Sequence, residues 1–357
     1  MFLNLWYRLN YFLHDFSGYL IFILISIIAF VFASFKIYRS NLSENKKKII
    51  LASFFVIFSI ILIYSGLEAY FRYRFDESDS LGFLKVNGKW FERHVVFNNY
   101  FVRDRNFESK KEEGRIRIGV IGDSIAMGYG IKNVEDRFSN ILEKKLKDEK
   151  FNVEVYNLGK SGYNLDSEVK EYNSSFKHLD FDIIVWEYFL NDAQPKEKDE
   201  GTRVLLREQA QSELMQVISN YSYFFDYVYW RMAARYDKTF KELRNADMNA
   251  YKDPENFSRH KDNVISFINQ LKKENRKIVV MVFPFMAFLP DYPAKDIHRR
   301  MSEIFKKEEV EPIDLLDDLK NKQSKDLVVS RYDYHPNKFV HKLAAERLYD
   351  RIVPLLK

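Results

Sequence analysis

The chain has 357 residues, no cysteine, and a formal net charge of +5 from 56 basic and 51 acidic side chains. This composition excludes a disulfide framework and any metal site built on cysteine. All of the net charge falls in residues 1–75, which hold eight Lys or Arg and three Asp or Glu. A nucleic-acid-binding domain normally carries a basic patch, so the neutral remainder of the chain predicts that nucleic acid is not a partner.

The N-terminal region contains two uncharged apolar stretches, Gly18–Phe35 and Ile49–Gly66. Each is just long enough to cross a bilayer as a helix, and neither shows the polar stripe of an amphipathic helix. We therefore predict two transmembrane helices. The alternatives are a buried helix pair in a soluble core and, for the first stretch, a cleaved signal peptide, although only Arg8 precedes it as a positive charge and no clear cleavage site follows.

The loop between these stretches sets the expected orientation. Five basic residues lie within Lys36–Lys48, and the positive-inside rule places such a loop in the cytoplasm. Both termini and the C-terminal part of the chain then lie outside. We expect residues 1–75 to form a transmembrane hairpin anchor and residues 76–114 to form a juxtamembrane connector whose apolar side chains pack on the following domain.

From residue 115 onward, strands alternate with helices. Near-continuous apolar runs predict buried parallel strands at 116–121, 153–158, 181–189, 277–283 and, more briefly, 310–315. Helical spacing predicts helices at 136–149, 165–178, 257–275 and 294–307. This alternation indicates an α/β domain over residues 115–357, with a mostly parallel five-stranded sheet covered by helices on both faces.

A long interval at residues 194–259 does not fit this alternation and is interpreted as a helical insertion. It contains a run rich in aromatic residues between Tyr221 and Trp230. Such a cluster is more often core than binding surface. A lid over the site, or a shoulder facing the membrane, is the alternative.

Four stretches with polar or glycine-rich composition end strands or lie in loops at one edge of the predicted sheet. They are residues 122–124, 157–164, 188–192 and 333–337. Ser124 lies where the first strand passes into a helix, and ligands of open α/β sheets bind at that edge. Asp333 and His335 supply a carboxylate and an imidazole, so the chain holds the parts of a serine nucleophile with a histidine base.

Together and in this order, the four stretches resemble the SGNH (GDSL-type) hydrolase superfamily over residues 115–357. The resemblance implies a flavodoxin-like three-layer α/β/α fold. It also implies that Ser124 is the nucleophile, His335 the general base and Asp333 its orienting carboxylate. The oxyanion hole would comprise the backbone N–H groups of Ser124 and Gly162 and the side chain of Asn191.

Two positions depart from the family pattern. Phe189 stands where the family's Gly-x-Asn-Asp block has glycine, which predicts a narrower site. The last block is usually Asp-x-x-His, but Tyr332 occupies the usual aspartate position and Asp333 lies one residue nearer to His335. Either Asp333 reaches the histidine through a bent loop, or a carbonyl orients the ring and a Ser-His dyad remains.

The segment Asn98–Asp104 resembles the Asn-x-x-Gly-x-Arg-Asp lead-in of a membrane-anchored bacterial branch of the superfamily, with Phe101 in place of the glycine. This likeness and the predicted anchor imply a two-pass protein of the bacterial inner membrane with an extracytoplasmic catalytic domain.

The function expected from the resemblance is that of a serine esterase without cofactor or metal. It would cleave O-acyl esters, O-acetyl groups above all, on an envelope glycan or a lipid. The first alternative is transfer of the acyl group to a glycan hydroxyl by the same residues, because water and sugar compete for one acyl-enzyme. The second is a catalytically silent envelope scaffold, which the altered motifs keep open.

Overall fold

The computed structural model describes residues 2–80, 82–194, 213–236, 245 and 247–357. They form two compact units, Met1–Asp76 with Leu214–Tyr229, and Glu77–Glu213 with Trp230–Lys357. Parts of the predicted insertion, residues 195–212, 237–244 and 246, lie outside the described residues.

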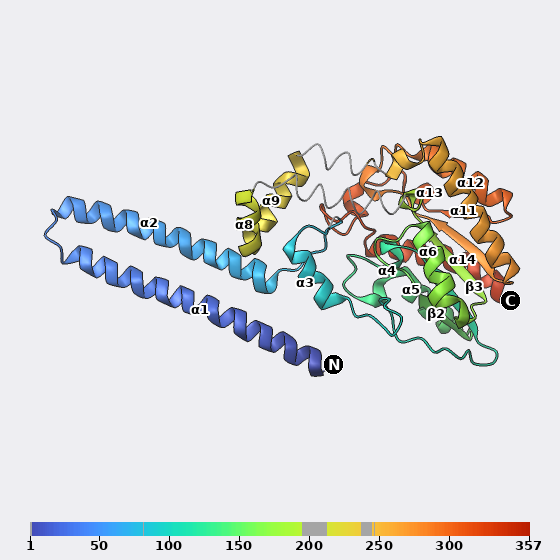
Figure 1. Ribbon diagram of the computed structural model, residues 1–357, viewed down its shortest axis with the longest axis horizontal. Helices are drawn as coiled ribbons and strands as arrows, with labels where there is room; N and C mark the ends of the chain where they lie inside the picture. Colours follow the sequence, from blue (N-terminus) through green and yellow to red (C-terminus); the bar gives the residue numbers. More distant parts are fainter. Residues whose placement is uncertain (1, 81, 195–212, 237–244, 246) are drawn as a thin grey trace. The chain divides into compact units, whose positions relative to one another are not determined.

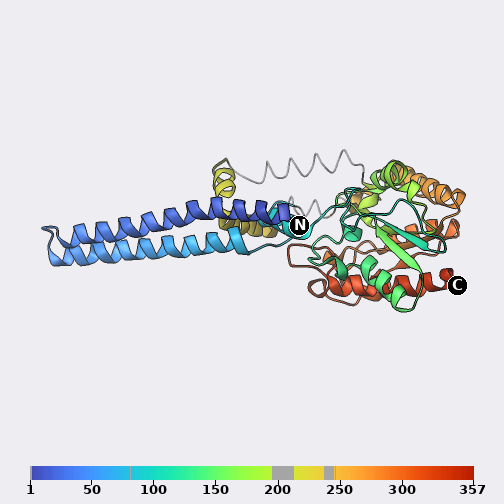
Figure 2. The same ribbon diagram turned by 90° about the horizontal axis from the view of Figure 1, so that it is seen from below.

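The first unit contains two long antiparallel helices, α1 (Phe2–Tyr38) and α2 (Glu44–Ala69) (Figures 1 and 2). Aromatic side chains join them, since the ring of Phe30 stacks on that of Phe58 with 4.0 Å between centroids. Helix α1 ends and helix α2 begins at a short loop, residues 39–43, which contains part of the predicted basic segment.

Two segments of this unit, Tyr19–Tyr38 and Glu44–Arg74, are long and apolar enough to cross a membrane. Almost none of their apolar side chains is buried. The helices therefore do not form the buried core that a soluble helix pair would require.

The aromatic part of the predicted insertion forms helices α8 (Glu213–Tyr221) and α9 (Tyr223–Tyr236). The ring of Tyr227 lies 4.5 Å from that of Phe71, which follows α2. Glu68 of α2 accepts the N–H groups of the first two residues of α9, both at 3.0 Å. Within the first unit, this aromatic run packs against the end of α2.

The second unit is built on a five-stranded sheet in the order β2-β1-β3-β4-β5, and every neighbouring pair is parallel. The strands are β1 (Ile116–Ile121), β2 (Val153–Asn157), β3 (Ile183–Tyr188), β4 (Lys277–Val282) and β5 (Ile313–Asp314). This is the flavodoxin-like strand order.

Helices cover both faces of the sheet, so the unit has three layers (Figure 2). On one face lie α5 (Phe138–Asp148) and α14 (Lys338–Leu356); on the other lie α6 (Leu165–Glu171), α11 (Pro254–Lys273) and α12 (Lys295–Lys307). Trp186 of β3 packs edge-on against Phe267 of α11 and Phe305 of α12. The predicted α/β fold with a five-stranded parallel sheet is confirmed.

Candidate active site

Ser124 lies at the carboxyl edge of the sheet, as the first residue of the short helix α4 (Ser124–Met127). Asp123 caps this helix, because its Oδ1 accepts the N–H of Ile125 at 2.7 Å. A side-chain oxygen at this position satisfies one of the amides that a helix start leaves unpaired. The strand–turn–helix sequence thus holds the Ser124 hydroxyl beside a set of backbone N–H groups.

The loop after β2 packs closely against α4. A Cβ at Gly159 would lie 2.5 Å from the backbone nitrogen of Met127, so only glycine allows this approach. Asn157 donates to the carbonyl of Ala126 at 2.6 Å. These contacts fix α4 from the side of β2.

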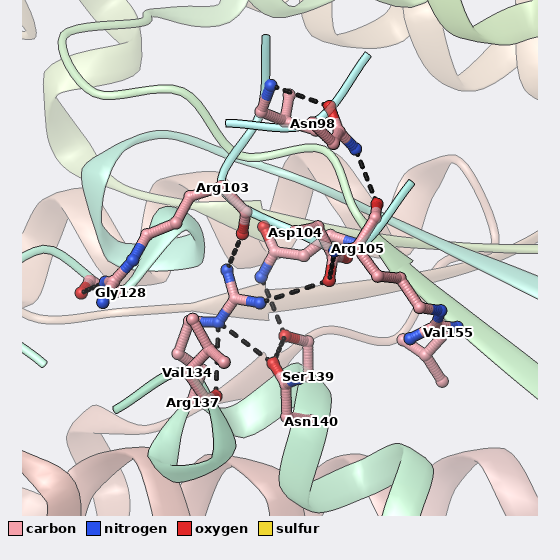
Figure 3. A network of polar contacts seen from close by, with 12 residues as sticks. Asn98, Arg103, Asp104, Arg105, Gly128, Val134, Arg137, Ser139, Asn140 and Val155 are labelled. Carbon is pink, nitrogen blue, oxygen red and sulfur yellow. Dashed lines mark hydrogen bonds and ion pairs between the residues drawn. The ribbon is translucent and has the colours of Figure 1, made fainter. Parts of the chain in front are cut away.

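Two buried arginines bind backbone carbonyls in and around the turn that follows α4 (Figure 3). Arg103 donates to the carbonyls of Gly128 and Ile131, both at 2.7 Å. Arg137 donates to the carbonyl of Arg103 and pairs with Asp104 at 3.5 Å. Burial and the neighbouring charge of Arg137 lower the pKa of Arg103 to about 10, so the Arg103 guanidinium remains charged at neutral pH.

Ser124, His335 and Asp333 form a continuous hydrogen-bonded row. His335 Nε2 lies 2.8 Å from Ser124 Oγ, and His335 Nδ1 lies 2.5 Å from Asp333 Oδ1. Asp333 is fully buried. Burial opposes its ionisation, but the pKa of Asp333 is nevertheless lowered because His335 and the hydrogen bonds to the carboxylate outweigh burial. The arrangement has the geometry of a nucleophile, a base and an orienting carboxylate.

The aspartate at the shifted position is thus the group that contacts the histidine ring, rather than a carbonyl. Its Oδ1 also accepts the backbone N–H of His335 at 3.1 Å, which closes a tight turn. Tyr332, at the position where the family has aspartate, lies against Arg231 with 3.1 Å between the guanidinium carbon and the ring centroid. It lines the cavity next to Ser124.

The predicted oxyanion donors Gly162 and Asn191 line the same cavity as Ser124. Gly162 has a φ of +78°, and a Cβ there would meet no atom within 4 Å. The Asn191 amide donates to Asp123 Oδ2 at 2.6 Å and, over the longer distance of 3.4 Å, to the carbonyl of Tyr163. The structure therefore brings all five predicted site residues to one edge of the sheet.

The cavity beside Ser124 has a volume of about 370 Å³. Phe189 lines it and packs on Phe285 with 4.5 Å between ring centroids. Other aromatic side chains line the rest of the wall: Phe83, Tyr129, Tyr163, Trp230, Phe288, Tyr332 and Tyr334. The site therefore offers flat apolar surfaces around a small polar centre.

Beneath α4 lie carboxyl groups that are fully buried. Glu187 Oε2 accepts the N–H groups of Asp123 and Ala126, at 3.1 and 3.3 Å, on either side of the nucleophile. Burial, with the charges of Asp123 and Glu168, raises the pKa of Glu187 well above its ordinary value. Burial likewise raises the pKa values of Glu168 and Asp192 well above the ordinary value of a carboxyl group, and so favours their neutral forms.

Three residues that were not predicted from the sequence also support the site: Ser80 and Asn87 of the connector and Glu187 of β3. Glu187 had a signal, a lone charge inside an otherwise apolar strand. Ser80 and Asn87 had none, because they lie in a connector of mixed composition. In the described part of the chain, no group of three or more His, Cys, Asp or Glu side chains could hold a metal ion.

Comparison with known proteins gives one family. The sequence profile of the GDSL-like lipase/acylhydrolase family matches residues 120–343, whereas no curated protein sequence matches. Similar solved structures include TesA, which is 16% identical over 68% of this chain and 98% of its own, with a TM-score of 0.41. The esterase EstA from Pseudoalteromonas sp. is 15% identical over 67% of this chain and 98% of its own, with a TM-score of 0.42. The lipase/acylhydrolase from Enterococcus faecalis is 14% identical over 68% of this chain and 97% of its own, with a TM-score of 0.43.

Proposed function

The chain belongs to the GDSL-like lipase/acylhydrolase family and is an ester-bond hydrolase, and from this premise we propose that it is a membrane-anchored serine esterase that acts through an acyl-enzyme on Ser124. The observation that carries the proposal is the row from Ser124 through His335 to Asp333, with contacts of 2.8 and 2.5 Å.

In this mechanism Ser124 Oγ attacks the ester carbonyl carbon while its proton passes to His335 Nε2. The backbone N–H groups of Ser124 and Gly162 and the Asn191 amide donate to the carbonyl oxygen as it becomes negative. Asn191 turns its amide from the long bond with Tyr163 toward this oxygen. Donors aimed at developing charge in a water-poor site are a large source of rate enhancement.

The tetrahedral intermediate then collapses. The C–O bond to the alcohol breaks, and His335 gives the proton to the leaving oxygen. Water attacks the acyl-enzyme and gives a proton to His335. The bond between the acyl carbon and Ser124 Oγ then breaks, His335 returns the proton to Ser124 Oγ, and the carboxylic acid leaves. Asp333 stays ionised throughout, holds the imidazole by Nδ1 and stabilises the imidazolium.

For the substrate we propose an O-acyl ester on an envelope glycan or lipid, with a short acyl group such as acetyl. Phe189 takes space beside the nucleophile that glycine would leave open, which favours a small acyl group. Aromatic walls suit the apolar faces of a sugar ring or a lipid chain.

For the location we propose the inner membrane of a bacterium. The two apolar helices of the first unit would cross it, and the segment Lys36–Lys48 with its five basic residues would remain in the cytoplasm. The hydrolase unit would then work on the outer side, where envelope glycans and lipids are within reach.

The test is hydrolysis of p-nitrophenyl acetate by the full chain in detergent micelles. We expect turnover by the wild type, a fluorophosphonate adduct on Ser124, and loss of both in Ser124→Ala. A Ser124→Ala variant that hydrolyses at the wild-type rate overturns the proposal. Adding sugar acceptors separates hydrolysis from transfer, since an acceptor-dependent ester product identifies a transferase. A chain that neither hydrolyses nor labels is the scaffold.

A further inference from the structure

The connector contributes a hydroxyl to the catalytic row. Ser80 Oγ donates to Asp333 Oδ1 at 3.2 Å, across 253 positions of sequence. The same oxygen accepts the backbone N–H of Tyr334 at 2.7 Å, and the Ser80 N–H donates to the carbonyl of Tyr332 at 3.4 Å. Ser80 thus binds the turn that holds Asp333 at three points.

The backbone around Ser80 is itself fixed. Asp79 Oδ2 accepts the N–H groups of Phe83 and Leu84, at 2.7 and 3.0 Å. The N–H of Asp79 donates to Asn87 Oδ1 at 3.0 Å. Asp79 and Asn87 are buried, so these bonds are shielded from water and fix Asp79, the residue before Ser80.

The same segment also reaches the other side of the histidine. Asn87 Oδ1 accepts the hydroxyl of Tyr129 at 2.7 Å, and the Tyr129 ring lies 4.8 Å from the His335 ring. Trp90 of helix α3 (Lys85–His94) packs behind Tyr129 at 4.9 Å. Residues of the connector therefore contact Asp333 directly and His335 through Tyr129.

The spacing of the two catalytic groups explains why such support matters. Asp333 lies two residues before His335, so both belong to one short turn and would move together if the turn shifted. A hydroxyl from a distant segment ties the carboxylate to the rest of the unit. It also donates to the oxygen that faces Nδ1, and hydrogen bonds to ionised groups are stronger than those between neutral groups.

We propose that Ser80 is a positioning residue of the esterase: its hydroxyl holds Asp333 Oδ1 against His335 Nδ1, and catalysis depends on this bond. The inference rests on the proposed function of the Ser124 row. It assigns a role in the reaction to the segment that directly follows the membrane hairpin in sequence, outside the residues that the family profile matches.

The test compares variants of the full chain in detergent micelles, with p-nitrophenyl acetate as substrate. For Ser80→Ala we expect kcat to fall about ten-fold, the size expected for a lost hydrogen bond to a charged group. KM should stay within about two-fold, because the bond to Asp333 acts on the histidine base rather than on the binding of the substrate. Ser80→Thr keeps the hydroxyl, so its kcat should be at least about three-fold higher than that of Ser80→Ala.

Ser330→Ala is the matched control. Ser330 Oγ accepts the N–H groups of Tyr332 and Asp333, at 3.2 and 3.1 Å, in the same turn but does not bind the carboxylate. If its kcat falls as far as that of Ser80→Ala, the role of Ser80 is only to stabilise the turn and the proposal is wrong. Ser80→Cys, which keeps the volume but is a weak donor, should behave as Ser80→Ala and remain folded by thermal unfolding.

The outcomes separate this inference from the function on which it rests. Ser124-dependent hydrolysis with an unchanged kcat in Ser80→Ala, or a Ser80→Thr variant no faster than Ser80→Ala, overturns the inference alone. Absence of Ser124-dependent hydrolysis in the wild type overturns both.

Discussion

At the scale of residues, the turn from Val329 to His335 shows how a shortened motif still brings a carboxylate to the histidine. The Val329 N–H bonds the carbonyl of His335 at 3.0 Å, and the Ser330 N–H bonds that of Asp333 at 3.1 Å. The chain therefore folds back on itself, and a carboxylate two residues away reaches Nδ1. A motif spaced by three residues needs no such fold, which is why spacing alone left Asp333 and a carbonyl as alternatives.

Phe189 is the residue through which we expect the site to select the acyl group. In Phe189→Gly the cavity widens beside Ser124, so longer acyl chains gain contact area there. An added methylene in an apolar pocket changes specificity by roughly ten-fold or more. We expect the ratio of kcat/KM for p-nitrophenyl hexanoate to that for the acetate to rise by at least about ten-fold.

Phe189→Leu is the control, because it keeps an apolar side chain of similar reach and should retain the preference for acetate. An unchanged chain-length profile in Phe189→Gly would show that this ring does not limit the acyl site.

At the scale of elements, the lead-in before β1 holds a turn that favours glycine. Phe101 has a φ of +56°, and Asn98 Oδ1 accepts the N–H groups of Tyr100 and Val102 at 2.8 and 3.2 Å. The left-handed conformation costs a residue with a Cβ roughly 1–2 kcal/mol. The Phe101 side chain is 76% exposed, so it has little packing to lose.

We therefore expect Phe101→Gly to stabilise the hydrolase unit by about 1 kcal/mol, seen as a rise in its thermal midpoint. Phe101→Ala removes the same ring but keeps the Cβ, and should give no such gain. Equal midpoints for the two variants would contradict the strain argument.

Glu187 joins β3 to α4, and its effect on stability depends on pH. Because its pKa is raised in the folded state, the folded chain holds a proton that the unfolded chain loses. The contribution of this proton to the unfolding free energy is fully present below the pKa of an exposed glutamate. It is lost as pH rises toward the pKa that Glu187 has in the folded state. Glu187→Gln carries no such proton but keeps an oxygen that accepts the N–H groups of Asp123 and Ala126.

Between pH 5.5 and 7.5, we expect the unfolding free energy of Glu187→Gln to fall less steeply with pH than that of the wild type; one proton can change this slope by at most about 1.4 kcal/mol per pH unit. The measurement is denaturant unfolding across this range. Glu143→Gln is the control, since the pKa of Glu143 is lowered, with Arg105 the largest favourable influence against burial. Glu143→Gln should lower the unfolding free energy without flattening its dependence on pH. Equal slopes of unfolding free energy against pH for Glu187→Gln and the wild type would contradict the proposed role of the Glu187 proton.

The regular elements were predictable because their signals are local. The first four strands follow from apolar runs, and β1 has the predicted bounds. The fifth, predicted at 310–315, is only the two residues Ile313–Asp314. The helix predicted at 294–307 is α12 within one residue, since its apolar side chains recur at helical spacing. The predicted helix at 165–178 instead ends at Glu171 as regular α-helix and continues through a π-turn and a 3₁₀ turn.

The contacts that support the site were not predictable in the same way. Ser80 meets Asp333, and Asn87 meets Tyr129, through pairings of residues far apart in the chain that no periodicity encodes. Helix α3 itself has few apolar residues to reveal it, although Trp90 is fully buried, as expected for an apolar side chain of the connector. Sequence motifs therefore indicate the reacting groups, whereas the groups that hold them in place are evident only in the folded structure.

At the scale of the whole molecule, charge and hydropathy divide the chain in the same way as its chemistry. The net charge of +5 belongs to residues 1–75, and both apolar helices lie there. The reacting groups all belong to the second unit. This division leads to the proposed orientation, in which basic residues hold one end of the hairpin in the cytoplasm and the hydrolase unit lies on the opposite side of the membrane.

The absence of cysteine from the chain allows a direct test of that orientation. Ser43→Cys places a thiol in the loop between α1 and α2, and Asn321→Cys places one on the second unit; both positions are exposed. In spheroplasts of a Gram-negative host, a membrane-impermeant maleimide should label Asn321→Cys directly and Ser43→Cys only after lysis, because the basic loop resists translocation. The reverse pattern would invert the orientation. If the intact mass of the labelled chain shows that it begins after Phe35, the first helix is a signal peptide. Substitution of Lys46–Lys48 by Gln should weaken the difference in labelling between the two positions, because these charges set the orientation.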